Sequence, residues 1–164
     1  MAVLLRKMLG IGALTDEQRE YIAGESLLHL AEFVPVTFRF SGHVPGKIAK
    51  GNLRSYVGAL AFTDHRLLGT LSSGPKKAAK TINRPWSEPK GSLVHATVDS
   101  SGVLLDVPDM SDISRCFSGS MSLRYKTALP DELLARLPQR EFVFDVPQKY
   151  VYLACGMPPS GSAP

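Results

Sequence analysis

The stretch GALAFTDHRLL, residues 58–68, decides the fold that we expect for this chain of 164 residues. An apolar run ends at Phe62, four polar residues follow, and apolar residues resume at Leu67. Two apolar runs separated by a short polar segment are typical of a β-hairpin. The side chains of Thr63 and Asp64 can bond the backbone of the turn, which favours a tight connection at this point. The stretch therefore predicts antiparallel β-structure in the middle of the chain.

The segment before this hairpin also has the period of a strand. Residues 34–40 alternate between apolar and other side chains, as a half-buried strand does, and Pro35 indicates an edge or a bulge. This strand could begin as early as Leu27, and a helix over residues 26–33 is the competing interpretation. Further upstream, residues 15–18 read TDEQ, which has the form of a capping box and predicts a helix that ends near Gly24.

Several more strands are expected after the hairpin. Residues 92–98 and 103–107 alternate around a turn in which Gly102 occupies a position that often needs a positive φ. Proline and acidic residues followed by a leucine stripe predict a short amphipathic helix over residues 130–137. The other predicted strands are residues 53–62, 66–71, 76–82, 113–126 and 141–146, whereas residues 72–75 and most of 84–91 are expected to be loop. Residues 150–153 fit either a strand or a helix.

About seven strands followed by a helix is the order of the pleckstrin-homology superfold, and residues 58–68 resemble the hairpin of bacterial PH-like and GRAM domains. Those families place Thr-Asp/Asn-x-Arg between two apolar strands, as Thr63, Asp64 and Arg66 stand here. The upstream Gly24-Glu25 is similar to the start of their first strand. The resemblance implies a mainly β, PH-like barrel of about seven strands with a short C-terminal helix. The additional N-terminal helix, the shortness of the final helix and the residues after it depart from the pattern.

The charge is concentrated in one part of the chain. The whole chain carries 19 Lys and Arg against 15 Asp and Glu, a net charge of +4. Residues 39–90 alone carry +8, an excess that can attract phosphate, acidic lipid or an acidic protein face. Two cysteines are too few for a disulfide scaffold, and their spacing matches no zinc pattern. No apolar run approaches the ~20 residues of a membrane-spanning helix.

The resemblance implies where a ligand would bind. Lipid-binding members of the superfold use a basic loop between their first two strands, which corresponds here to residues 42–52. The candidate ligand or phosphate contacts are Lys47, Lys50, Arg54, Arg66, Lys76 and Lys77. For the motif around Arg66, a purely structural role is the competing interpretation, since an arginine beside a turn can bond backbone carbonyls or a carboxylate.

The expected function is that of a non-catalytic binding or adaptor module. Its partner would be another protein or an anionic membrane surface, with an apolar N-terminal helix over residues 1–14 assisting. A small β-barrel that carries an apolar ligand is the alternative. We find no pattern for an enzyme, a cofactor or a metal site, and a single Trp86 beside Arg84 gives little support for nucleic-acid binding.

The chain is expected to hold one globular domain. We expect a helical N-terminal segment over residues 1–24, the β-domain over residues 25–156 and a disordered tail over residues 157–164. A cytoplasmic location is expected, with contact at the periphery of a membrane, because the N-terminus does not have the form of a secretory signal.

Overall fold

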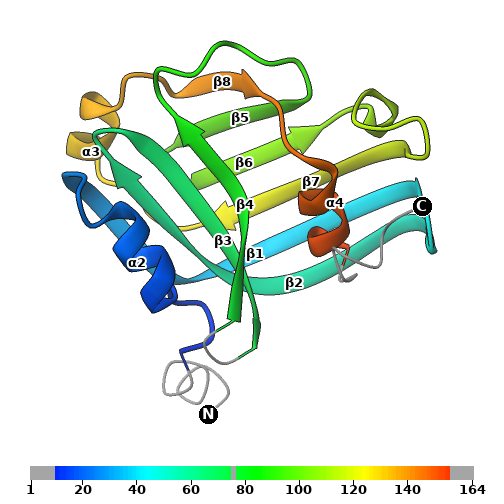
Figure 1. Cartoon of the computed structure of the whole chain (residues 1–164), viewed down its shortest axis with the longest axis horizontal. Helices are drawn as coiled ribbons and strands as arrows, with labels where there is room; N and C mark the ends of the chain where they lie inside the picture. The colour runs from blue at the N-terminus through cyan, green and yellow to red at the C-terminus, as the bar shows by residue number, and fades with distance from the viewer. Residues whose placement is uncertain (1–9, 75–76, 156–164) are drawn as a thin grey trace.

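The computed structural model describes residues 10–74 and 77–155, which form a single curled antiparallel sheet with short helices (Figure 1). The eight strands follow the order β4-β3-β2-β1-β7-β6-β5-β8, so β4 and β8 are the two edges of the sheet. The sheet curls into a half-barrel (Figure 1). The strands are β1 Leu27–Val44, β2 Lys47–Thr63, β3 Arg66–Gly74, β4 Lys77–Pro85, β5 Val94–Asp99, β6 Gly102–Val107, β7 Ser118–Lys126 and β8 Glu141–Phe144. The helices are α2 Asp16–Ile22, α3 Asp131–Arg136, α4 Gln148–Ala154 and a 3-10 turn, η1, at Met110–Asp112.

The predicted mainly β class is confirmed, and the hairpin of residues 58–68 lies where the sequence placed it, between β2 and β3. Of the two alternatives for residues 26–33, the structure has the strand: β1 begins at Leu27 and runs to Val44. Residues 150–153, which fitted either a strand or a helix, belong to the helix α4. The loop expected at residues 72–75 is wrong at its start, because β3 continues to Gly74, and β4 likewise extends to Pro85.

The prediction of a basic loop at residues 42–52 is wrong. These residues continue β1 and β2 as one long hairpin whose turn is only Pro45-Gly46, with Gly46 at φ 91°. The loop was expected from the resemblance, because lipid-binding members of that superfold carry a basic loop between their first two strands. In the structure Gly51 takes a φ of 67° in a stretch where the pairing register shifts by one residue, as in a β-bulge.

The core lies on the concave side of the half-barrel. Because successive strand residues point to opposite faces, Leu60 and Phe62 pack into this core while Ala59 and Ala61 face the other way. Helix α3 adds Leu133 and Leu134 to the main core, and α4 adds Val151 and Tyr152. The opposite face of β2 and β3 is covered by α2, which packs in a small second core with Leu14, Ile22, Ala59, Ala61 and Leu68 (Figure 1).

The two predicted helices form close to where they were expected. In α2 the capping box is complete: the Thr15 hydroxyl accepts from the Gln18 backbone and the Gln18 side chain accepts from the Thr15 backbone. Helix α3 begins after Pro130, but it does not end the fold, because β8 and α4 follow it. The helix expected over residues 1–14 falls largely outside the described residues, and residues 10–13 form turn and bend; the predicted tail, residues 157–164, also lies outside them.

Candidate functional site

Arg66 lies in a network of contacts within the protein. Its Nε donates to both carboxylate oxygens of Glu25, at 3.1 and 2.9 Å, and its Nη2 lies 2.8 Å from the same group. Its Nη1 donates to the Tyr21 hydroxyl at 2.7 Å and to the side-chain Oδ1 of Asn83 at 3.1 Å. The Arg66 donors are thus used by α2, by the segment between α2 and β1, and by β4, which fits the structural interpretation of this motif.

The rest of the same motif is also structural. The Thr63 hydroxyl accepts from the backbone N–H groups of His65 and Arg66 and donates to Glu25 at 2.6 Å. Asp64 ties the turn to Ser26 twice, since its backbone N–H donates to the Ser26 carbonyl and its carboxylate accepts from the Ser26 N–H. Gly24-Glu25 and residues 63–66, which are far apart in the sequence, therefore form one contact region. This region joins the β2–β3 turn to the start of β1.

Lys47 and Arg54 meet at the C-terminal end of α4. The Lys47 ammonium donates to the Cys155 carbonyl at 3.1 Å, and the Arg54 Nη1 lies 3.4 Å from the same oxygen. The Tyr56 hydroxyl donates to the Ala154 carbonyl at 3.1 Å. The last carbonyls of a helix carry partial negative charge and lack partners within the helix, so cations are stabilising there. Three residues of β2 thus cap a helix about a hundred residues later in the chain.

The remaining candidate lysines do not join this cluster. Lys50 is exposed on the β1–β2 hairpin near Gly51. Lys77 begins β4, but its side chain and the whole of Lys76 lie outside the described part of the structure. Of the six candidates, the structure brings together Lys47 and Arg54 and places Arg66 elsewhere.

The outer face of the hairpin carries exposed apolar side chains beside cations. Ile48 is 75% exposed and Leu53 is 59% exposed. Ile48 pairs in register with His43, and Leu53 pairs with Arg39, which is also exposed. Residues 39–63 contain no Asp or Glu. We call Arg39, Ile48, Lys50 and Leu53 the hairpin surface, which combines exposed apolar area with positive charge.

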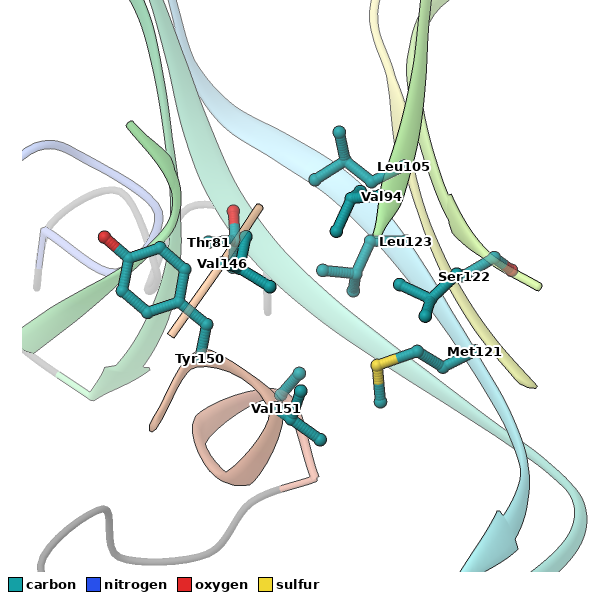
Figure 2. Close-up of a pocket in the computed structure, with 11 residues that line it drawn as sticks. Thr81, Val94, Leu105, Met121, Ser122, Leu123, Val146, Tyr150 and Val151 are labelled. Atoms are coloured by element: carbon teal, nitrogen blue, oxygen red, sulfur yellow. The ribbon is translucent and has the colours of Figure 1, made fainter. Parts of the chain in front are cut away.

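A small apolar cavity lies under α4 on the concave side (Figure 2). Its volume is about 40 Å³, room for about three water-sized groups. Leu105, Met121 and Leu123 line it from β6 and β7, while Val151 and Ala154 close it from α4. Ala154 also offers its carbonyl to Tyr56, so the cavity and the cation cluster lie at the same end of α4.

Cys155 is buried beside this cluster. Burial raises the pKa of its thiol to about 11, although the neighbouring Lys47 and Arg54 charges act to lower it. Cys116, by contrast, is exposed. Within residues 10–74 and 77–155, no group of three or more His, Cys, Asp and Glu side chains could hold a metal ion. No helix in the same ranges is long and apolar enough to cross a membrane.

Arg84 and Trp86 make buried contacts near the edge strands β4 and β8 that the sequence did not predict. Arg84 points inward from β4, is buried, and donates to Glu88 at 2.9 Å and to the Pro89 carbonyl at 3.1 Å. Trp86 packs its ring edge-on against Phe142 of β8, with centroids 5.9 Å apart. Trp86 is therefore a buried anchor just after the end of β4, and its ring is not exposed for stacking on a base.

Comparisons with protein-family models, with curated proteins and with solved structures found no match. The resemblance to PH-like domains therefore remains an expectation, and the functional inference depends on the geometry of the hairpin and of the concave face.

Proposed function

We propose that this chain is a non-catalytic binding module that docks on an anionic membrane surface through the hairpin surface. The observation that carries the proposal is the exposure of Ile48 and Leu53 within a stretch that has cations and no acidic residue. Exposed aliphatic side chains surrounded by positive charge are suited to the boundary between lipid headgroups and acyl chains.

The magnitudes favour reversible binding. Each Lys or Arg near an anionic leaflet contributes about 1 kcal/mol, so Arg39 and Lys50 together supply a modest attraction. Burying an exposed Ile or Leu side chain adds roughly 1.5–3 kcal/mol. Because the Ile48 and Leu53 terms depend on burial and the cation terms on charge, the two contributions respond differently to salt.

Vesicle sedimentation tests this function. We expect the protein to sediment with vesicles that contain phosphatidylserine and to remain in solution with phosphatidylcholine alone. At 1 M salt the charge attraction is screened beyond about 3 Å, so binding should fall sharply. Replacing Ile48 or Leu53 by Asp should weaken binding about tenfold or more, because each change removes a buried aliphatic group and adds a repelled charge.

Leu27→Asp is the matched control. Leu27 is 52% exposed at the opposite end of β1 and lies outside the hairpin surface, so its replacement should leave sedimentation unchanged. Absence of binding to anionic vesicles, or an equal loss in Leu27→Asp, would contradict the proposal. Binding to a soluble acidic protein but not to vesicles would instead favour a protein partner for the same surface.

A further inference from the structure

Helix α4 has two chemically different sets of contacts with the sheet. At its C-terminal end, Lys47, Arg54 and Tyr56 converge on the carbonyls of Ala154 and Cys155. Along its buried face, side chains of α4 line the cavity against β6 and β7 (Figure 2). A cationic end beside an apolar concave face is the arrangement that an anionic head and an apolar chain require.

The donors at the C-terminal end of α4 are charged, whereas the acceptor that they share is neutral. Lys47 and Arg54 direct their charges at an uncharged peptide carbonyl, with distances of 3.1 and 3.4 Å. Hydrogen bonds between charged partners are shorter and roughly twice as strong as neutral ones. A carboxylate or phosphate at the position of the Cys155 carbonyl would therefore bind these two cations more tightly, with the Tyr56 hydroxyl as a third donor.

The apolar chain of a ligand would need the volume that the buried side chains of α4 fill. The cavity of about 40 Å³ cannot hold an extended acyl chain. Val151, Tyr152 and Ala154 are buried against the concave face, and Tyr152 packs edge-on against Phe117 with centroids 5.5 Å apart. Departure of α4 would join the cavity to the space of these side chains and expose a continuous apolar surface formed by the sheet.

The sequence of α4 suits a displaceable segment. It has only seven residues, QKYVYLA, and a helix this short is not stable in water without packing. Its helical form therefore depends on the sheet beneath it. The strands, in contrast, are joined by backbone pairing that does not involve α4.

We infer that α4 occupies, within the chain itself, the binding site of a single-chain anionic amphiphile such as a fatty acid. The head would take the place of the Cys155 carbonyl at Lys47, Arg54 and Tyr56, and the chain would take the place of the α4 side chains over Leu105, Met121 and Leu123. This inference gives the expected carrier of an apolar ligand a defined site and an anionic head. It does not depend on membrane docking, which uses the outer face of the hairpin.

The buried thiol of Cys155 reports the position of α4. In a Cys116→Ser background, Cys155 is the remaining cysteine of the chain, and it is buried with a pKa raised to about 11. It should react slowly with a maleimide or disulfide reagent near pH 8. Monomeric dodecanoate should displace α4 and accelerate the labelling at least tenfold in a saturable manner, while far-UV circular dichroism and Trp86 fluorescence remain those of the folded protein.

Variants of the polar end decide whether the head binds as proposed. Lys47→Ala with Arg54→Ala should raise the dodecanoate concentration at half effect about tenfold or more, whereas Lys50→Ala, on the same hairpin but away from α4, should leave it unchanged. Dodecanol, which lacks the charge, should bind more weakly than dodecanoate. Acceleration by phosphatidylserine vesicles without free fatty acid would assign the same site to a membrane phospholipid.

Three results would overturn the inference. Labelling that dodecanoate leaves unchanged or slows would show that α4 stays in place. Acceleration that is equal in the Lys47/Arg54 double variant would show that the head does not bind there, and acceleration with loss of the folded spectrum would show simple denaturation. Because dodecanoate is tested without vesicles, failure of this inference is separate from failure of membrane docking.

Discussion

Replacing Arg66 by methionine is expected to reduce the free energy of unfolding by about 3 kcal/mol or more, a large share of the roughly 5–15 kcal/mol that stabilises a typical domain. Arg66 and Glu25 are 17% and 10% exposed in their side chains. Without the guanidinium, the Glu25 carboxylate stays in a mostly buried place with the Thr63 hydroxyl as its remaining described hydrogen-bond donor. Tyr21 and Asn83 also lose a partner. Urea denaturation followed by circular dichroism measures the effect.

Two further variants distinguish the cost of leaving the Glu25 charge buried and unpaired from the cost of losing an ordinary ion pair. Glu25→Gln combined with Arg66→Met removes both charges while the amide can still accept from Thr63, so the double variant should be more stable than Arg66→Met alone. Arg19→Met breaks a pair with Glu32 in which Arg19 is 46% exposed, and it should cost less than about 1 kcal/mol. A loss in Arg66→Met no larger than that in Arg19→Met would show that the network contributes little.

Replacing Trp86 by alanine is expected to cost about 3–5 kcal/mol. The ring is buried, its Nε1–H donates to the Thr63 carbonyl at 2.9 Å, and its edge contacts Phe142. It thus connects the β2–β3 turn to β8 on the side where the two edge strands meet, since the Arg84 guanidinium of β4 lies 5.8 Å from the centroid of the Phe142 ring of β8. Circular dichroism during urea denaturation is the appropriate measurement, because Trp86 is the single tryptophan and its fluorescence disappears in the variant.

Trp86→Phe tests which part of the side chain matters. Phenylalanine keeps an aromatic ring against Phe142 and removes the indole donor to Thr63, which should cost about 1 kcal/mol. An equal loss in both variants would assign the stabilisation to the hydrogen bond, and no loss in Trp86→Ala would show that the half-barrel does not need this connection.

Most strands could be predicted because their determinants are local. Alternation marked the strands, Thr63 and Asp64 marked the central turn, and Gly102 adopts the expected positive φ of 132° at the β5–β6 turn. Helix α4 could not be assigned in this way, since its valine and tyrosines also favour strands and its helical state depends on packing against a distant part of the chain. The basic loop was wrong because it was carried over from the resemblance, whereas β1 and β2 here continue to Val44 and from Lys47 as one long hairpin.

The candidate site was predictable only in part. Charge counting located the cations of the hairpin, and the resemblance pointed to Lys47, Lys50 and Arg54. Neither could show that Lys47 and Arg54 bond the carbonyl of Cys155, because this contact joins positions 108 and 101 residues apart in the chain. The exposure of Ile48 and Leu53 also depends on which face of β2 meets the core, and the bulge near Gly51 changes that alternation.

The central place of β1 has a consequence for how the protein is made. β1 pairs with β2, which follows it directly, and with β7, which is synthesised much later. Ribosomes add about 5–20 residues per second, so one edge of β1 remains unpaired for several seconds while the intervening strands emerge. The same strand carries Val36, Phe38 and Phe40, whose side chains are fully covered in the finished fold. Wrong pairing at this edge is therefore the expected route to aggregation during synthesis, and variants that weaken β7 should lower the yield of folded protein more than their equilibrium stability alone would suggest.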